Sequence, residues 1–307
     1  MAGAPGTTPT SLLVTAAIRT PANPDRVIHA ASDIRIGTFR CPVDHPGFRS
    51  AGPIEGYTVV FPRSAVWIQH EGRPAFVADP GVVTIYNRGQ PYVRMPLSAE
   101  GDRSDWLSLS RELAVSIVAA IDPESAGDPA GPFPVAFGPS SAALYYRQRL
   151  LFARVMHGAI DEFELEQEVL LLVGTALERA MLAGRQPAPT RPGAQRELVE
   201  RARAEIARDP FRSRTIRELA AGLGASPFHL CRTFRRVTGL TLHHYRLDLR
   251  TRLALERIEG RAPSLSRVAQ ELGFSSHSHF TAAFRRRMGR TPSRARTQLR
   301  REGRAIG

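Results

Sequence analysis

Two stretches of the chain, "IRELAAGLGASPFHLCRTFRRVTGLT" (Ile216–Thr241) and "LSRVAQELGFSSHSHFTAAFRRRMGRT" (Leu265–Thr291), repeat one another. The matching residues lie 49 positions apart before a shared glycine and 50 positions apart after it. The pairs include Leu219 with Val268, Gly224 with Gly273, Leu230 with Phe280, Phe234 with Phe284 and Gly239 with Gly289. Pairing that continues on both sides of one inserted residue indicates two copies of a single structural unit.

Each copy predicts a helix, a tight turn and a second helix. Both copies have a glycine where the chain turns sharply and a serine that caps the next helix, and the first copy also has a capping box before its apolar periodic run. The residues are Thr215 with Glu218, then Gly224 and Gly273, then Ser226 and Ser276. Two short helices joined by a glycine-containing turn form a helix-turn-helix.

The second helix of each copy divides into two faces on a wheel of about 100° per residue. In the first copy the apolar side is Leu230, Phe234 and Val237, and the other side is Phe228, Cys231, Arg232 and Arg235. In the second copy Phe280, Phe284 and Met288 oppose Ser278, Thr281, Ala282 and Arg285. A helix anchored on one side and offering arginine and hydrogen-bonding groups on the other fits a DNA major groove.

Charge is concentrated in the same region. The net charge is +13, and all 42 basic residues are arginine. From Arg191 onward there are 26 arginines against 10 acidic residues, whereas the preceding 190 residues hold 16 against 19. This asymmetry predicts a polyanionic partner for the C-terminal third alone.

The histidine-rich start of the second of these helices has competing interpretations. A metal site is disfavoured because His277 and His279 have no cysteine or acidic companion at ligand spacing. His277 is predicted to contact a base or phosphate, and His279 either does the same or packs beside Phe280. The run Arg285–Arg287 is predicted to grip phosphate, with a solvated charged face as the alternative.

The stretch "ELGFSSHSHFTAAFRRRMGRTPSRAR" resembles the second helix-turn-helix of AraC/XylS-family transcription regulators. That pattern is Gly-Phe, a polar run, Phe-x-x-x-Phe and Gly-x-x-Pro, matched here by Gly273, Phe274, Phe280, Phe284, Gly289 and Pro292. "RLDLRTRLALERI" (Arg246–Ile258) resembles the family's connecting helix, with Arg250 and Ala254 at its characteristic positions. The resemblance covers about Gln195–Arg300. It implies two recognition helices about 34 Å apart that enter adjacent major grooves.

The family resemblance and the helical-wheel pattern together predict which residues contact DNA. They are Phe228, His229, Cys231, Arg232, Arg235, His277, Ser278, Thr281, Ala282, Arg285 and Arg286. Ala282 departs from the family, in which arginine is common there, so a methyl contact or shape readout is expected instead. Phe228 has the alternative of packing at the helix start. Cys231 is interpreted as a small groove-facing side chain, against the alternative of a redox sensor.

The sequence of the N-terminal part predicts short β-strands followed by helices. Six β-type runs are separated by Gly- and Pro-containing turns: "IRIGTF", "YTVVF", "AVWIQH", "PAFVA", "VVTIYN" and "YVRM". Strands of this length and turn chemistry predict an antiparallel barrel or sandwich. Two helical patterns follow: Leu144, Arg147, Leu151 and Val155, then Phe163, Leu170, Val173, Leu177 and Met181. The second stripe is interpreted as packed core or a dimer seam.

This organisation resembles the ligand-responsive members of the family, whose N-terminal half is cupin-like. The predicted fold is α+β with two domains, a cupin-like antiparallel β-barrel with following helices and an all-α double helix-turn-helix. The expected divisions are a disordered lead (1–20), a sensing domain (21–138), a helical dimerisation or coupling segment (139–183), a linker (184–194), the DNA-binding domain (195–300) and a tail (301–307).

The predicted barrel offers a few candidate residues for binding a ligand or a metal. An apolar or aromatic effector is predicted to use Trp67, Tyr86, Tyr92 and Trp106, with ordinary barrel core or rim as the alternative. The His-x-His pattern of metal-dependent cupins is missing beside His70. Cys41 and His45 have metal-compatible spacing, but "CPVDHPG" also reads as a turn, so no metal and no cofactor are expected.

The function expected is a sequence-specific, effector-responsive transcription activator with no catalytic activity. The alternatives are a constitutive DNA binder or repressor whose N-terminal domain only oligomerises, and a cupin or methyl-accepting repair enzyme fused to a DNA-binding domain. Expected partners are double-stranded promoter DNA, a small effector, a second copy of the chain and, for an activator, RNA polymerase. Two distant cysteines and no apolar stretch near 18 residues predict a cytoplasmic protein without membrane contact.

Overall fold

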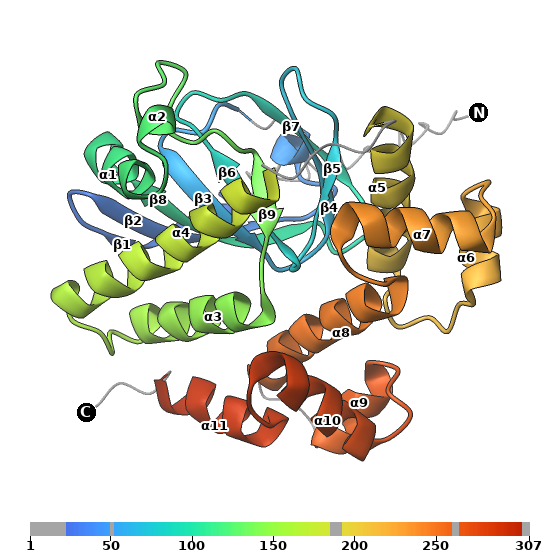
Figure 1. The fold of residues 1–307 in the computed structure, drawn as a ribbon. Coiled ribbons are helices and arrows are strands. Elements are labelled where there is room, and N and C mark those ends of the chain that lie inside the picture. The colour runs from blue at the N-terminus through green and yellow to red at the C-terminus, as the bar shows by residue number, and fades with distance from the viewer. Residues whose placement is uncertain (1–22, 50–51, 185–191, 260–263, 303–307) are drawn as a thin grey trace, which may run out of the picture.

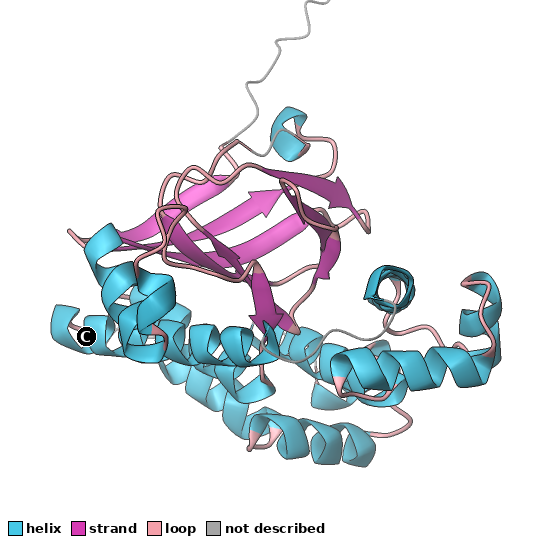
Figure 2. Ribbon diagram, turned by 45° about the horizontal axis from the view of Figure 1, so that its top comes forward, coloured by secondary structure: helices cyan, strands magenta, loops and turns pink. Residues whose placement is uncertain are grey.

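The computed structural model describes residues 23–49, 52–184, 192–259 and 264–302. Figures 1 and 2 show a β-barrel lying over a layer of helices, with the helices of the repeat beneath it and to one side. The α+β architecture expected from the sequence is confirmed. The predicted lead, most of the predicted linker and most of the tail fall outside the described residues.

The barrel consists of two antiparallel sheets that face each other. The larger has the order β1 (Asp25–Ala30), β2 (Ile34–Cys41), β8 (Asp102–Leu109), β3 (Tyr57–Pro62), β6 (Val82–Tyr86) and β9 (Phe137–Pro139). The smaller has the order β5 (Phe76–Ala78), β4 (Val66–His70) and β7 (Tyr92–Pro96). All six predicted strands are confirmed. Strands β1, β8 and β9 were not predicted.

The helices fall into two groups along the chain. The first group is α1 (Arg111–Ile121), α2 (Pro123–Ala126), α3 (Ala142–Met156) and α4 (Glu162–Gly184). The second is α5 (Pro192–Arg208), α6 (Ile216–Gly222), α7 (Pro227–Thr238), α8 (Leu242–Glu259), α9 (Leu265–Glu271), α10 (His277–Met288) and α11 (Pro292–Glu302). Both predicted helix-turn-helices are present, as α6–α7 and α9–α10.

The main core lies between the larger sheet and helices α1, α3 and α4. Val173, Leu177 and Met181 of α4 are buried, so most of that stripe is packed core. Phe163 is the exception, because it is 79% exposed and lies about 80° around the helix from Val173. Including it in the stripe was wrong.

Helix α3 belongs to two cores at once. Leu144, Leu151 and Phe152 pack into the barrel core. Tyr145 and Tyr146 pack instead into a second core with residues of α8–α11. One helix therefore joins the barrel to the second helix-turn-helix.

No helix among the described residues is long and apolar enough to cross a membrane.

Candidate nucleic-acid interface

The helix ends and the turn of the first helix-turn-helix are determined by the capping residues and the glycine that the sequence predicted. The Thr215 hydroxyl accepts a hydrogen bond from the Glu218 backbone N–H, and the Glu218 carboxylate accepts one from the Thr215 N–H, which completes the capping box. Gly224 has a φ of +67°, a conformation that side chains with a Cβ rarely adopt. The Ser226 hydroxyl then caps α7 by accepting from His229 N–H at 3.2 Å. These contacts fix where α7 begins.

Helix α7 has the two faces that the wheel predicts. Leu230 and Phe234 are fully buried in a core with α5, α6 and α8. The opposite face is exposed and carries Phe228, His229, Cys231, Arg232 and Arg235. Phe228 is 75% exposed, so its alternative role as a packing residue at the helix start is not supported.

Helix α10 repeats this arrangement. Phe280 and Phe284 are fully buried, while His277, Ser278, Ala282, Arg285 and Arg286 are exposed. Thr281 departs from the expectation, because it is half-buried and its hydroxyl is shielded from solvent without a hydrogen-bond partner among the described residues. In this conformation the Thr281 hydroxyl is therefore not presented on the exposed face.

The other histidine of this helix packs locally. Ser276 caps α10 by accepting from His279 N–H at 3.0 Å. The His279 ring lies edge-on to Phe274, with 5.6 Å between centroids, and its Nδ1 lies 2.9 Å from the Ser275 hydroxyl. Packing is thus the better interpretation of His279.

The arginines on the exposed faces of α7 and α10 differ in whether they form ion pairs with acidic residues. Arg232, Arg235, Arg285 and Arg286 form no ion pair with any described residue. Arg287 forms an ion pair with Asp248 of α8 and is only half-exposed. The phosphate role predicted for Arg287 is therefore corrected to a structural one, whereas the other four guanidinium groups are available to an external anion.

Helix α8 holds the two units together through Arg250. Its Nε donates to the Pro210 carbonyl at 2.6 Å and its Nη2 to the Phe211 carbonyl at 3.1 Å, both just before the first unit. Its Nη1 donates to the Gly273 carbonyl at 3.0 Å, in the turn of the second unit. Ala254, one turn on, is fully buried. Arg250 therefore lies at the junction of the two units, whereas Ala254 packs in the core of the second.

A cavity of about 270 Å³ lies between the two sheets of the barrel. Three of the four residues predicted to contact an effector line it, namely Tyr86, Tyr92 and Trp106. Trp67 does not, because it lies on the other face of β4 and packs against the cluster that contains Ala204 of α5. Its assignment as a ligand residue is corrected for that reason.

The cavity also has a polar wall that the sequence did not predict. Buried Arg94 donates to the Asp102 carboxylate at 2.9 Å and to the Phe48 carbonyl at 3.0 Å. Burial raises the pKa of Asp102, and the Arg94 charge opposes that rise. The remaining polar lining consists of four hydroxyl groups and three charged groups: Thr58, Thr84, Ser104, Ser108, Asp25, Arg35 and Glu55. The cavity can therefore bind a small molecule with both polar and flat apolar parts.

His70 lies beside this cavity in a fully buried position. Its Nδ1 is 2.8 Å from Gln90 Nε2, and its ring is 4.7 Å from that of Tyr86. Its Nε2 has no hydrogen-bond partner among the described residues. Burial lowers the pKa of His70 from 6.5 to about 4, so the folded protein holds this ring neutral.

The stability of the barrel is therefore expected to fall as the pH is lowered from 6.5 towards 4. In that window the unfolded chain binds a proton at His70 that the folded chain does not. At 1.36 kcal/mol per pKa unit, the loss approaches about 3 kcal/mol. The measurement is the difference in unfolding free energy between the natural chain and His70→Gln across this range. His229→Gln, at an exposed histidine, is the control, and equal pH profiles for all three proteins would contradict the expectation.

The segment containing Cys41 and His45 forms a turn. Cys41 is buried in an apolar cluster with Phe48, and burial raises the pKa of its thiol. The His45 Nδ1 accepts a hydrogen bond from Gly47 N–H at 3.0 Å, which caps a short 3₁₀ helix (Pro46–Phe48). No group of three potential metal ligands occurs in the described ranges. The turn interpretation of "CPVDHPG" is confirmed.

Comparison with known proteins places the C-terminal helices among transcriptional regulators. A helix-turn-helix domain family matches residues 219–298. The regulatory protein SoxS of Escherichia coli K12 is 37% identical over 76 residues, which are 25% of this chain and 71% of SoxS. The HTH-type transcriptional regulator YidL of the same strain is 33% identical over 99 residues, 32% of this chain and 33% of YidL.

The match to a third relative is shorter. LumQ of Photobacterium leiognathi, a probable transcriptional regulator, is 48% identical over 61 residues, which are 20% of this chain and 25% of LumQ. The chain thus covers about a third of YidL and a quarter of LumQ. All three matches are confined to a minor part of this chain.

Proposed function

The chain belongs to the AraC/XylS family of transcriptional regulators, and from this premise we propose that it is a sequence-specific DNA-binding regulator whose barrel responds to a small molecule. The two helix-turn-helices read adjacent major grooves, and the barrel cavity takes the effector. Activation of transcription stays a prediction from the resemblance.

The main observation in support of DNA binding is that α7 and α10 each present an exposed polar face. Each helix buries phenylalanine on one side and presents arginines without an acidic partner on the other. Arginine bonds bidentately to guanine in the major groove, and it also neutralises phosphate. Arg250 of α8 donates hydrogen bonds to the backbone just before the first unit and in the turn of the second, so both units are anchored to one helix.

A constitutive DNA binder is the second candidate. The cavity favours effector response over that candidate, because an oligomerisation module has no need of a partly hollow barrel with a buried ion pair in its wall. The two candidates differ in whether a small molecule changes DNA affinity.

Selection of duplexes from a random pool by the full chain tests the DNA-binding proposal. The expected product is a single site with two fixed base blocks about 10 to 10.5 base pairs apart, one for each recognition helix. Failure to enrich any sequence contradicts the proposal, and one fixed block alone contradicts the two-groove arrangement. A melting-temperature screen of small metabolites, followed by DNA-affinity measurements with each hit, tests effector response.

A further inference from the structure

Helix α8 presents one polar face to the N-terminal part of the chain. Tyr245, Arg252, Glu256 and Glu259 share this face. The Tyr245 hydroxyl donates to Asp79 Oδ2 at 2.6 Å, and Arg252 Nη2 donates to the Ser140 carbonyl at 2.6 Å. The helix that connects the two DNA-binding units is therefore held along its length by residues that precede it by more than a hundred positions.

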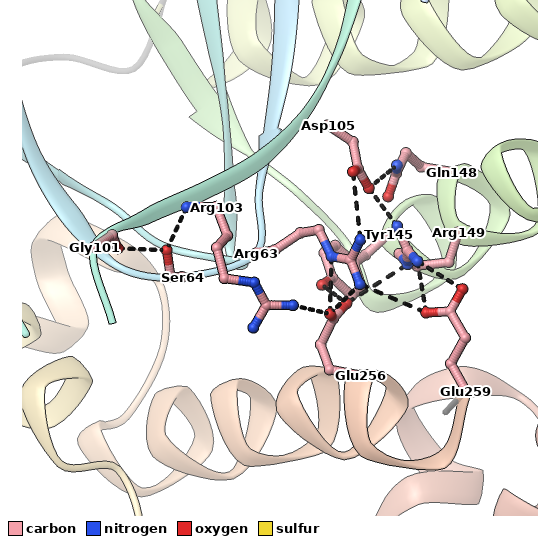
Figure 3. Close-up of polar contacts among 10 residues, drawn as sticks. All are labelled: Arg63, Ser64, Gly101, Arg103, Asp105, Tyr145, Gln148, Arg149, Glu256 and Glu259. Atoms are coloured by element: carbon pink, nitrogen blue, oxygen red, sulfur yellow. Dashed lines mark hydrogen bonds and ion pairs between the residues drawn. The ribbon is translucent and has the colours of Figure 1, made fainter. Parts of the chain in front are cut away.

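The contacts are densest near the C-terminal end of α8 (Figure 3). Arg63 Nε donates to Glu256 Oε2 at 2.8 Å, Arg103 Nη2 lies 3.3 Å from the same oxygen, and the Tyr145 hydroxyl donates to Oε1 at 3.0 Å. Burial acts to raise the pKa of Glu256, but the surrounding arginines, Arg149 first, hold it below the usual value. Glu256 is thus a buried, ionised carboxylate.

Asp105 of β8 is the counterpart of Glu256 on the barrel side. Its carboxylate is fully buried and accepts hydrogen bonds from Gln148 Nε2, at 2.8 Å, and from Arg149. Arg149 Nη2 also donates to Glu259 Oε1 at 2.7 Å. We call Arg63, Arg103, Asp105, Arg149, Glu256 and Glu259 the α8 clamp. It joins the barrel, α3 and α8 with three positive and three negative groups.

Strand β8 carries the clamp on one face and the cavity on the other. Asp102, Ser104, Trp106 and Ser108 line the cavity. Between them, Arg103 and Asp105 point to the clamp (Figure 3), in keeping with the alternation of side chains along a strand. Only the thickness of one strand separates a molecule in the cavity from the acids of α8.

Two buried atoms of the clamp are held by ion pairs alone. Asp105 Oδ1 lies 3.5 Å from Arg63 Nη1, and Arg149 Nε lies 3.5 Å from Glu256 Oε1, but neither atom has a hydrogen-bond partner among the described residues. Beside the clamp, the buried Gln148 Oε1 also has no hydrogen-bond partner there. Buried ionic groups are costly unless every one is paired and hydrogen-bonded, so a partly satisfied network is sensitive to small shifts of its members. A displacement of β8 by a ligand would therefore alter the ion pairs and hydrogen bonds of the clamp.

We propose that β8 couples the barrel cavity to DNA binding through the α8 clamp, with Arg103 and Asp105 as the residues that transmit cavity occupancy to α8. The inference rests on the proposed function, because its readout is DNA affinity. Allosteric coupling of this kind changes an affinity by roughly 5-fold to 150-fold.

The experiment uses the full chain. Because the ligand is unidentified, an enlarged side chain inside the cavity takes its place. Ser104→Leu places a larger group in the cavity, and dissociation constants for the selected duplex are measured in three backgrounds: natural, Arg103→Gln and Glu71→Gln. Arg103 is only partly buried, so its replacement is tolerable, and Glu71 is an exposed residue after β4 that belongs neither to the cavity lining nor to the clamp. Ser108→Leu is the second cavity variant, and circular dichroism checks that each protein is folded.

The expected result is a change of about 5-fold or more with Ser104→Leu in the natural and Glu71→Gln backgrounds. In the Arg103→Gln background the change should shrink to about 2-fold or less. The same change in all three backgrounds, or none in any, overturns the coupling while leaving DNA binding intact. A natural chain that enriches no duplex overturns the proposed function itself.

Discussion

The affinity of the full chain for duplex DNA is expected to fall by about three to five powers of ten between 50 and 200 mM salt. A protein that neutralises Z phosphates releases condensed counterions, which gives a log–log slope near −0.9Z, and six to ten contacts give a fall of this size. The exposed, unpaired arginines of α7 and α10 and the strongly basic C-terminal third supply such contacts.

The measurement is the dissociation constant across a salt series on the selected duplex and on a random one. Glu55→Gln, which changes charge only on the N-terminal part, is the control and should leave the slope unchanged. A dissociation constant that does not move with salt contradicts the electrostatic basis of the interface. A slope altered by Glu55→Gln points to a contact outside the C-terminal helices.

Asp105→Ala is expected to destabilise the folded chain by about 3–5 kcal/mol, since removing one member of a buried ion pair leaves the other uncompensated. Arg149 and Gln148 both lose their bond to Asp105, and three arginines then face two acids within the clamp. For a chain of this size the loss corresponds to a melting temperature lower by roughly 10 °C.

Thermal unfolding of Asp105→Ala beside Glu55→Gln measures this effect. The exposed Arg35–Glu55 pair, with 3.9 Å between its charged atoms, is of the kind that contributes little to stability, so its loss should leave the melting temperature nearly unchanged. Equal small shifts for the two variants contradict the view that the clamp holds the barrel on α8.

The helix-turn-helices were predictable because their determinants are local. Thr215, Gly224 and Ser226 act within a few residues of their own positions, and the burial of Phe234 and Phe284 follows from helical periodicity. The same holds for the six predicted strands, in which runs of β-branched and aromatic residues are interrupted by turn residues.

Strand β8 escaped prediction for a physical reason. A strand with one solvent face alternates between apolar and polar residues, but "DRSDWLSL" is polar on both faces over its first half. Its two aspartates are buried, Asp102 in the ion-paired cavity wall and Asp105 in the clamp. The alternation of Trp106, Leu107, Ser108 and Leu109 was the one available signal.

The ion pairs of the clamp could not be predicted from the local sequence. Arg63 and Glu256 are 193 positions apart, and a glutamate on a helix is usually a solvated charge. The misplacement of Trp67 has a similar origin, because the pattern of β4 does not show which of its faces meets the cavity and which meets α5.

The central claim, that α7 reads bases and that both helices grip the backbone, predicts different behaviour for two exposed arginines. Arg232 lies on the outward face of α7 within two turns of its N-terminus, whereas Arg286 lies near the C-terminal end of α10. Loss of a base-reading arginine costs about 1–3 kcal/mol on the cognate site alone, whereas loss of a phosphate contact weakens all sequences and reduces the salt slope by about 1.

Paired salt titrations of Arg232→Ala and Arg286→Ala, each on the selected duplex and on random DNA, test this claim most directly. Arg232→Ala should weaken binding to the selected duplex by about 5-fold to 150-fold and leave binding to random DNA nearly unchanged. Arg286→Ala should weaken both and flatten the salt dependence. Equal losses on both DNAs for Arg232→Ala would contradict the assignment of α7 as a helix that reads sequence.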